Sequence, residues 1–559
     1  MGTLGLDTER GLFLGIDFGT TNSVVSIYNF QDGEAQTIPI DGSNIFPTAI
    51  QFESDPEDDN KLSRIFGVQA KEAAIIYPMS TILSIKRYLG SDQKVAVYVD
   101  DKEFSFTPEQ IAGEILGYLK LKADEYAQEE LGITGEFSGC VITVPANSTD
   151  KQKKMTKDAA VIAGFDPENI YLRLEPAASA ISYAVTEDSN KKVLVYDFGG
   201  GTFDACVLEI KIEEAGEPVI SIVSTYGDNN LGGNDIDKII MDIIYEEFKK
   251  LTEEEIDLFD ENADDGVSKR QKKVALVRLQ QAATQAKERL SQTKSTKVTL
   301  APLIQEPRIV NINIEITREQ FLTHQRVNAL GDSQEVYEKF RNKSVSDLIN
   351  ETLTCVSQCL EAGGLKESDI DEVFLVGGSS SILYVGEKIT ERFKKEPFKS
   401  RISPALSISQ GAAHYCNMIM MPTVRGPAVQ ERTIHPLGLE IAGRRFMEIV
   451  PSGQDIPKDG LTIDAGELLM TNYDGVTSMA IVVYESTRPR LEKDKQITVN
   501  QDGMKRLAGT SLRGIPQGPR GQEKVKVIFH VGQDNMLHVT AKSTSTDGVV
   551  TELSVDELY

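Results

Sequence analysis

The chain has 559 residues, of which 26% are charged and 40% hydrophobic, and its formal net charge at pH 7 is −26. The acidic balance argues against a nucleic-acid partner, because such binding depends on cations that meet phosphates, and no apolar run approaches the ~18 residues that span a bilayer. Five scattered cysteines exclude a disulfide scaffold, and with no signal-peptide pattern at the start they favour a soluble cytoplasmic protein.

Two similar turns follow apolar runs in the first half of the chain. Residues 1–10 show no periodicity and are predicted to be a disordered tail. The apolar run 12–16 then ends in Asp-Phe-Gly-Thr-Thr-Asn at 17–22, and the chain returns in a second apolar run. The same pattern recurs at 193–196, which leads into Asp-Phe-Gly-Gly-Gly-Thr-Phe-Asp at 197–204. Two related hairpins so far apart indicate an internal duplication with two similar lobes.

Strands and helices alternate between and after these hairpins. Residues 140–145 are predicted to form a buried strand, 150–164 a helix, 345–360 an amphipathic helix and 373–376 another strand. Alternation of this kind is typical of an α/β domain, which we expect over residues 11–420.

A second domain differs in its periodicity. Residues 421–433 are linker-like, and from residue 434 the helical period gives way to short alternating strands such as 525–531 and 537–541. We therefore expect an all-β sandwich over residues 434–559.

Three further features are interpreted as structural. The acidic stretch 251–265 is expected to be an exposed helix–loop segment, and the basic stretch 269–273 a solvated helix face. Cys355 and Cys359 lie four residues apart on the predicted helix without a second metal-binding pair, so they are expected to be partly buried apolar filler.

Glycine-rich turns follow three of the apolar strands, at residues 19–22, 199–202 and 377–379. Glycines let backbone N–H groups converge on phosphate oxygens, and Thr or Ser hydroxyls add further donors. One such turn is most simply a tight hairpin, but three in one chain favour a divided phosphate-binding site. The chain contains no G-x-x-x-x-G-K-[ST] motif, which argues against a P-loop NTPase.

Four charged side chains are candidates for the chemistry. Asp17 and Asp197 each end a strand beside a glycine turn, where a carboxylate suits Mg²⁺ that is bound mainly through water. Glu175, within Leu-Glu-Pro-Ala-Ala, has the chemistry to orient or deprotonate an attacking water, with a helix-start role as its alternative. Lys86 has the charge to neutralise a transferred phosphoryl group, although a surface lysine is the commoner fate and the pattern alone does not single it out.

The motifs closely resemble those of the Hsp70 chaperones, in order and spacing from residue 11 to residue 413 and more weakly through the β domain. The matching segments are 17–23, 141–146, 175–178, 197–204, 227–235, 374–379, 435–439 and 535–542. The resemblance implies an actin-like ATPase domain, of the duplicated ribonuclease-H-like α/β class, followed by a peptide-binding β-sandwich.

The resemblance also implies roles for individual residues. Lys86 and Glu175 would be the catalytic pair, with Asp197 serving the attacking water and Thr202 near the γ-phosphate. Asp17 and Asp197 would serve Mg²⁺, mostly through water, with K⁺ as a further candidate ion. The residues implied to bind ATP or ADP are Gly19, Thr20, Thr21, Asn22, Gly200, Gly201, Thr202, Gly232, Gly233, Lys287, Ser291, Gly378 and Ser379.

Several positions depart from the family pattern and predict an altered nucleotide affinity. Thr284 stands where the adenosine helix usually carries an acidic residue, and Ser381 replaces the usual Arg after the Gly-Gly-Ser loop. Ala405 and Leu406 replace an acidic pair. Lys153 replaces the allosteric Arg that follows the Val-Pro strand, and the charge is kept.

Other departures concern partners. The linker 429–434 lacks the family's leucine-rich run, which removes apolar surface for docking on the ATPase domain and predicts weakened coupling. Tyr171, Leu174 and Ala177 occupy the polar positions that receive J-domain partners, so a J-domain co-chaperone and a nucleotide exchange factor are expected only with an altered docking face. Residues 553–558 resemble the start of the helical lid; its truncation or natural absence both stay open, and a lidless site predicts fast peptide release.

Two functions remain open from the sequence. The first is an ATP-driven chaperone of low turnover, in which hydrolysis controls the binding of extended apolar segments of unfolded clients. The second is a divergent co-chaperone or scaffold that binds ATP with little coupled hydrolysis. The intact Lys86, Glu175, Asp197 and Thr202 favour the first. A sugar kinase on the same fold is excluded, because the β domain and the Glu-Pro-Ala-Ala segment resemble the chaperones.

Overall fold

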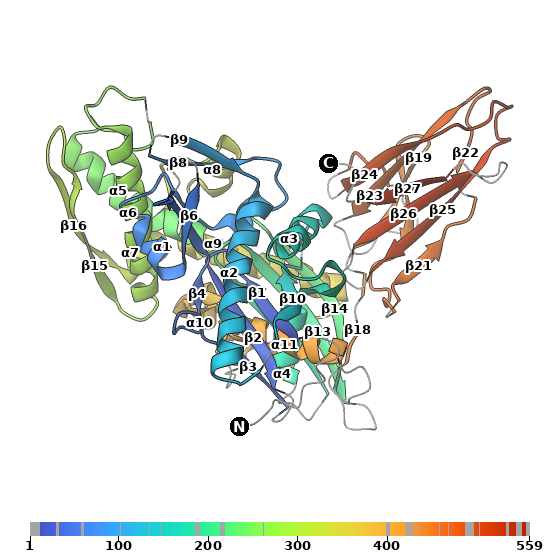
Figure 1. Cartoon of the computed structure of the whole chain (residues 1–559), viewed down its shortest axis with the longest axis horizontal. Coiled ribbons are helices and arrows are strands. Elements are labelled where there is room, and N and C mark those ends of the chain that lie inside the picture. The colour runs from blue at the N-terminus through green and yellow to red at the C-terminus, as the bar shows by residue number, and fades with distance from the viewer. Residues whose placement is uncertain are drawn as a thin grey trace.

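Figure 1 shows a computed structural model in which an α/β part, built from residues before 421 together with strand β18 (Ala428–Gln430), is followed by a separate group of strands. The predicted tail 1–10 lies outside the residues that the structure describes. Those residues are 12–29, 33–57, 61–100, 102–133, 135–146, 148–184, 190–212, 218–260, 262–398, 403–420, 428–430, 432–433, 435–457, 459–467, 469–486, 497–501, 504–532, 536–543 and 550–554.

The first lobe is built on a sheet with the strand order β11-β10-β1-β2-β3, to which β4 adds by pairing with β2. β1 and β2 form the first predicted hairpin, and β10 and β11 continue the sheet in parallel. Its elements are β1 (Leu12–Phe18), β2 (Asn22–Asn29), β3 (Glu34–Ile38), β4 (Phe46–Pro47), β10 (Phe137–Val144), β11 (Ile170–Leu174), α3 (Asp150–Ile162), η3 (Pro167–Asn169), α4 (Glu175–Ala184) and α11 (Ser407–Met420).

The second lobe repeats this arrangement with the strand order β17-β12-β13-β14-β18. β12 and β13 form the second predicted hairpin, and β17 runs parallel to β12 as β10 does to β1. The predicted duplication is therefore confirmed. The elements are β12 (Lys191–Phe198), β13 (Phe203–Ile212), β14 (Pro218–Asp228), β17 (Glu372–Val376), β18 (Ala428–Gln430), α9 (Val345–Gly363), η4 (Glu367–Asp369), η5 (Gly378–Ser381) and α10 (Leu383–Phe393).

Each lobe carries an outer region. The first lobe adds the sheet β6-β5-β7 and the hairpin β8-β9, and the second adds helices and the hairpin β15-β16. The outer elements are β5 (Ala49–Ser54), β6 (Leu62–Phe66), α1 (Gly67–Ala73), β7 (Thr81–Leu83), η2 (Ile85–Tyr88), β8 (Val95–Val99), β9 (Lys102–Phe106), α2 (Pro108–Glu129), α5 (Gly233–Thr252), α6 (Lys269–Leu290), β15 (Ser295–Ile304), β16 (Val310–Thr317), α7 (Arg318–Thr323) and α8 (Gln334–Phe340).

The C-terminal strands form two sheets, ordered β20-β19-β23-β24 and β21-β25-β26-β27, with β22 pairing with β25. Alternate residues of β25 and β26 are buried in one apolar core with residues of the first sheet, as the predicted hairpin requires. The elements are β19 (Leu437–Ile441), β20 (Arg445–Val450), β21 (Leu461–Asp464), β22 (Leu469–Met470), β23 (Ser478–Ser486), β24 (Met504–Arg513), β25 (Lys524–Val531), β26 (Leu537–Ser543) and β27 (Val550–Ser554).

The last strand reaches the segment that is predicted to begin a helical lid. Leu553 and Ser554 belong to β27, where they pair with Val539 and His538. The N-cap residue of a helix has extended backbone, so a strand that ends at Ser554 is compatible with a helix start there, and the lid stays a prediction. The remaining residues of that prediction, 555–558, lie outside the described part of the chain.

The charged stretches after α5 are largely exposed, as predicted, but each also has buried contacts. Lys272 is fully buried on α6, and its Nζ lies 2.6 Å from Oδ2 of Asp265. A buried ammonium needs a partner of opposite charge. Asp265 supplies this charge and therefore lies against α6. Leu258, in the same acidic stretch, is buried in the core of the second lobe. The acidic stretch therefore packs on α6, and the basic stretch is not a purely solvated face.

The cysteines behave as the sequence predicts. All five are free and buried, and Cys355 and Cys359 face the core of the second lobe. Burial raises the pKa of the Cys355 thiol to about 12 and that of Cys359 to about 11. Both sulfurs therefore act as apolar filler and stay protonated at neutral pH.

Helices α4 and α11 pack closely against each other in the first lobe. A Cβ added at Gly411 would overlap the backbone carbonyl of Ala178, so only glycine permits this crossing. His414, one turn further along α11, is buried with its ring edge-on to Tyr28, at 5.3 Å between ring centroids. Burial lowers the pKa of His414 from 6.5 to about 4, so its ring is neutral at pH 7.

Across the segments that the structure describes, no helix is both long and apolar enough to cross a membrane.

Candidate functional site

The turns of the two hairpins face each other. A Cβ on Gly200 would overlap the side-chain oxygen of Thr21, and a Cβ on Gly201 would lie 3.0 Å from Oγ1 of Thr20. The absence of side chains at both glycines is what lets the turns approach so closely. The structure thus brings together residues 19–22 and 200–202, as the sequence predicts.

The start of α5 joins the second turn. The Asn234 N–H donates to the carbonyl of Gly200 at 2.8 Å. The Gly232 N–H donates to the carboxylate of Asp235 at 2.8 Å, which caps the helix that begins at Gly233. Because a helix N-terminus carries partial positive charge, this end of α5 suits phosphate oxygens.

The loop after β17 borders the second turn from another side. The Ser379 hydroxyl donates to the carbonyl of Gly199 at 2.8 Å. Gly377 has a φ of +80°, and a Cβ there would lie 2.6 Å from Oδ1 of Asp197, so the position requires glycine. Gly378 is exposed with open space around its Cα. All three predicted glycine turns therefore border one site.

Lys86 and Glu175 form a nearly buried ion pair. Lys86 Nζ, on η2, lies 2.7 Å from Oε1 of Glu175, the first residue of α4, and the two side chains are 13% and 10% exposed. Burial works against the ammonium charge, but Glu175 and Asp17 outweigh it, and the pKa of Lys86 is raised. Lys86 therefore stays charged beside the carboxylates.

Asp17 and Asp197 crowd with Glu175 at the same place. Burial raises the pKa of Asp17 from 3.8 to about 7, with a further rise from Glu175 and an opposing effect of Lys86. Burial also raises the pKa of Asp197, and the negative charges of Glu175 and Asp204 add to the effect. Oδ2 of Asp197 is buried with no hydrogen-bond partner among the described residues. Such a cluster suits a cation, whose charge relieves the repulsion.

The donor set fits Mg²⁺ rather than a transition metal. Within the described ranges, no group of three or more His, Cys, Asp or Glu side chains is placed to hold a metal. Two carboxylates, Asp17 and Asp197, leave most ligand positions to water and phosphate, which is the coordination that Mg²⁺ favours.

Helix α6 brings Lys287 and Ser291 near the start of α5. Lys287 Nζ lies 2.8 Å from Oδ1 of Asp237 and donates to the carbonyl of Gly233 at 3.0 Å. The Thr284 hydroxyl donates to the other oxygen of Asp237 at 2.8 Å. The Ser291 hydroxyl donates to the Lys287 carbonyl at 2.9 Å. Lys287 therefore reaches the site, whereas the hydroxyls of Thr284 and Ser291 are used within the protein.

Two acidic residues at the site were not selected from the sequence. Asp204 lies opposite Asp197 across the β12–β13 hairpin, with Thr202 in the turn between the strands. Asp237 is the partner of Lys287. The repeated motif contains Asp204 and is a signal for it, but nothing local marks Asp237, because its partner comes from a different helix.

The predicted J-domain positions offer little polar surface. Leu174 and Ala177 are buried, and Tyr171 is half-buried with its ring 6.1 Å from that of Phe13. These side chains serve the core of the first lobe, so they present no charged or amide groups to a partner.

The linker docks on the second lobe through its backbone. β18 pairs in parallel with β14, so that residues 428–430 align with residues 219–221. The Ser221 hydroxyl also donates to Oε1 of Gln430 at 3.2 Å. Residues 428–430 thus dock through main-chain groups and not through leucine side chains, and the weakened coupling expected from the missing leucine-rich run stays a prediction.

Comparison with known proteins decides the family. The family model described as "Hsp70 protein" matches residues 13–557. The chain belongs to the Hsp70 family. It is 34% identical over 547 residues to "Chaperone protein DnaK" of Thermosipho melanesiensis, covering 97% of this chain and 80% of that protein. It is 34% identical over 541 residues to "Chaperone protein DnaK" of Thermotoga petrophila, covering 96% and 78%.

Membership in the Hsp70 family explains the architecture described above. The duplicated lobes are the actin-like, ATP-binding part of the Hsp70 fold, and the two C-terminal sheets are its β-sandwich. The fold class predicted from the sequence is therefore confirmed. At 34% identity the chain is a divergent member.

Proposed function

We propose that this Hsp70-family protein binds ATP with Mg²⁺, hydrolyses it to ADP and phosphate, and thereby controls its hold on extended apolar peptide segments. The observation that carries the proposal is the Lys86–Glu175 pair beside Asp17 and Asp197, bordered by three glycine turns. Family members are ATPases that bind peptide clients and co-chaperones. On composition, we also propose a cytoplasmic location.

Hydrolysis of ATP needs positioning and charge stabilisation more than covalent chemistry. The turns 19–22 and 199–202 bind phosphate oxygens through backbone N–H groups, and Lys86 stabilises the negative charge of the transferred group. Glu175 orients the attacking water. As the water oxygen bonds to the γ-phosphorus, the bridging P–O bond breaks and the water proton passes to Asp197. Mg²⁺, held mainly through water by Asp17 and Asp197, would supply positive charge to the phosphates.

The adenosine side of the site supports weaker binding than the family pattern implies. Ser381 carries no charge where an arginine is usual, and Thr284 directs its hydroxyl to Asp237. Lys287 is neutralised by the same carboxylate. We therefore expect the phosphate side of this site to supply most of the nucleotide affinity.

Contacts between the domains support coupling. A cavity of about 300 Å³ is lined by residues of both domains, and the linker strand β18 is held on the second lobe by its pairing with β14. Lys153 of α3 lies on its ATPase side, and His435, Glu485 and Lys505 lie on its β-domain side. These contacts join α3 of the ATPase part to the sandwich, and they support a route by which the nucleotide site influences peptide binding.

The co-chaperone or scaffold remains the second candidate. It is favoured by the buried Leu174 and Ala177 at the predicted J-domain face, since a chaperone cycle without a J-domain partner would turn over slowly. In that case ATP binding would stabilise one arrangement of the two domains, and hydrolysis would be incidental.

Single-turnover ATP hydrolysis with and without an extended apolar peptide tests the proposal, with Lys86→Ala as the blank. A matched control is Lys250→Ala, which removes an exposed ion pair to Glu247 at the end of α5 opposite to the site. Hydrolysis that rises with peptide, persists in the control and is lost in the blank supports the coupled chaperone. ATP binding without turnover, or turnover indifferent to peptide, supports the scaffold.

A further inference from the structure

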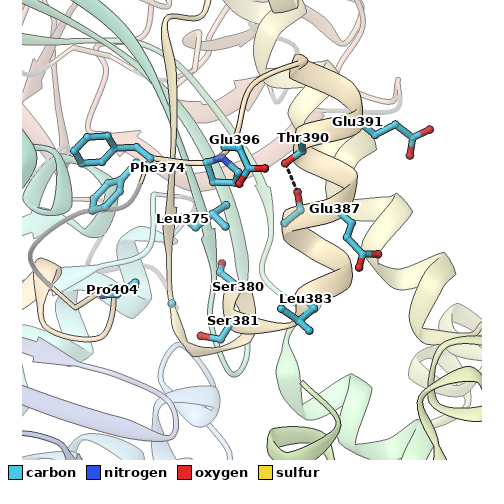
Figure 2. A pocket seen from close by; sticks show the side chains of 14 residues that line it. Phe374, Leu375, Ser380, Ser381, Leu383, Glu387, Thr390, Glu391, Glu396 and Pro404 are labelled. Carbon is cyan, nitrogen blue, oxygen red and sulfur yellow. Dashed lines mark hydrogen bonds between the residues drawn. The ribbon is translucent and has the colours of Figure 1, made fainter. Parts of the chain in front are cut away.

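A cavity of about 840 Å³ lies between strand β17 and helix α10, beside the nucleotide site (Figure 2). This volume is within the range of pockets that enclose small organic molecules. Figure 2 shows Leu375 on the side of β17 that faces helix α10, with Phe374 and Pro404 on the side away from that helix. The apolar side chains that line the cavity are Phe374, Leu375, Leu383, Pro397, Phe398 and Pro404.

Gly386 leaves part of the α10 side of the cavity without a side chain. A Cβ built on Gly386 meets no atom within 4 Å. Val385 and Ile389 of the same helix are buried in the core of the second lobe, so the helix is anchored by its other face. Glycine inside a helix destabilises it relative to alanine. Residue 386 is thus glycine, and its face of α10 is open, although alanine would stabilise the helix better.

The charged side chains among the described residues that line the cavity have one sign. Its charged lining residues are Glu387, Glu391 and Glu396. Glu391 is paired with Lys388 at 2.8 Å, and in Figure 2 both Glu387 and Glu391 point away from Leu375. Glu396 instead lies beside Leu375, and no ion pair to it occurs within the part of the chain that the structure describes. Glu396 is an exposed residue of the lining. An apolar wall beside a carboxylate that has no ion pair among the described residues favours a ligand with an apolar body and a cationic group.

The cavity shares a short loop with the nucleotide site. Ser380 and Ser381 of η5 line the cavity. Ser379 of the same turn bonds the carbonyl of Gly199, and Gly377 fits against Asp197. A molecule seated in the cavity therefore contacts the loop whose other side borders the proposed phosphate site.

We propose that this cavity is a regulatory site for a small apolar molecule that carries an amine cation. Glu396 binds the amine, Leu375 and Phe398 contact the apolar body, and the loop 377–381 transmits the occupancy to ATP affinity. The effect on ATP rests on the proposed function, whereas binding in the cavity does not. By linkage, ATP changes the affinity for the amine by the same factor.

Three naphthalene probes of one shape and different charge test the binding: 1-naphthylmethylammonium, 1-naphthalenemethanol and 1-naphthaleneacetate. Their fluorescence is read without protein background from tryptophan, because the chain has none. We expect the ammonium to bind about fivefold more tightly than the alcohol, the effect of one carboxylate about 4 Å away in water. The acetate binds most weakly. Equal affinities for the three probes would overturn the assignment of the charge.

Matched variants locate the site. Gly386→Leu places a bulky side chain of a good helix former in the cavity and is expected to weaken binding of all three probes, whereas Gly386→Ala keeps it. Glu396→Gln removes the preference for the ammonium and leaves the alcohol unchanged, and Glu391→Gln changes neither. Binding to Gly386→Leu at the parent affinity, or an ammonium preference that survives Glu396→Gln, refutes the proposal.

Binding of the amine in the cavity and its effect on ATP affinity are tested separately. ATP affinity is measured in the same samples with saturating ammonium probe, and a shift of at least fivefold is expected, the lower end of usual couplings between sites. Probe binding without a shift in ATP affinity overturns the regulatory role. A protein that binds the probe but no ATP refutes the proposed function and leaves the amine site standing.

Discussion

Strand β18, in the linker before the β domain, docks on the second lobe by backbone pairing with β14, and proline at Val429 and Gln430 is the perturbation that tests this docking. Successive N–H groups along a strand point in alternate directions. Of two adjacent prolines, one therefore removes an N–H that faces β14, whichever register the hydrogen bonds take. The variant Val429→Pro with Gln430→Pro also removes the acceptor of the Ser221 hydroxyl.

The size of the effect follows from these contacts. One backbone hydrogen bond and the Ser221–Gln430 bond are lost, each worth about 0.5 to 1.5 kcal/mol in net terms. The docked linker is then destabilised by about 1 to 3 kcal/mol, which changes the ratio of docked to undocked linker about 5- to 150-fold. We expect the basal hydrolysis rate to stay near the parent value, because no residue of the nucleotide site is altered.

The assay is single-turnover hydrolysis with and without an extended apolar peptide. The ratio of the two rates is expected to fall to near one in the proline variant. The control, Val429→Thr with Gln430→Glu, keeps both N–H groups and an acceptor for Ser221, so its ratio is expected to match the parent. A proline variant that responds to peptide as the parent does would refute docking by strand pairing as the route of coupling.

Three other predictions concern chemistry and stability. Lys86→Ala is expected to slow single-turnover hydrolysis about 10²- to 10³-fold at saturating ATP, and a rate within threefold of the parent would contradict its role. The folded state keeps His414 neutral down to about pH 4, while the unfolded chain protonates it below 6.5, so stability is lost as pH falls between these values. His414→Phe keeps an aromatic ring and is expected to narrow the difference in melting temperature between pH 8 and pH 5; an unchanged difference would argue against this origin. Gly411→Ala is expected to cost about 1 to 3 kcal/mol in urea unfolding through overlap with Ala178, whereas Gly386→Ala, in open space, costs nothing.

Local patterns carried the prediction of the two lobes and of the sandwich. The hairpins at 17–22 and 197–204 combine a strand, a glycine turn and a returning strand within a few residues, so their period and turn chemistry are visible in the sequence. The alternation along 525–531 is equally local, and the strand β25 is found where it predicts.

Contacts between residues that lie far apart in the sequence could not be predicted from local patterns. Lys272 is buried because Asp265 folds back to meet it, and Lys287 is held by Asp237 from another helix. β18 becomes a strand only because β14 presents a free edge. None of these partners is recognisable from the residue types alone, since each depends on which segments the fold brings together. The Lys86–Glu175 pair is of the same kind, and the resemblance to a family, rather than any pattern, singled out Lys86.

Because every cysteine is buried, the thiols of the folded protein react poorly with solvent-borne reagents. Thiolates, not thiols, react with oxidants and alkylating reagents, and burial raises the pKa of Cys359 in the second lobe and of Cys416 in the first. The native chain is therefore inert to such reagents, and its thiols become reactive only where a lobe opens. Labelling of Cys359 without labelling of Cys416 would mark an opening confined to the second lobe, so each lobe carries its own built-in reporter of local unfolding.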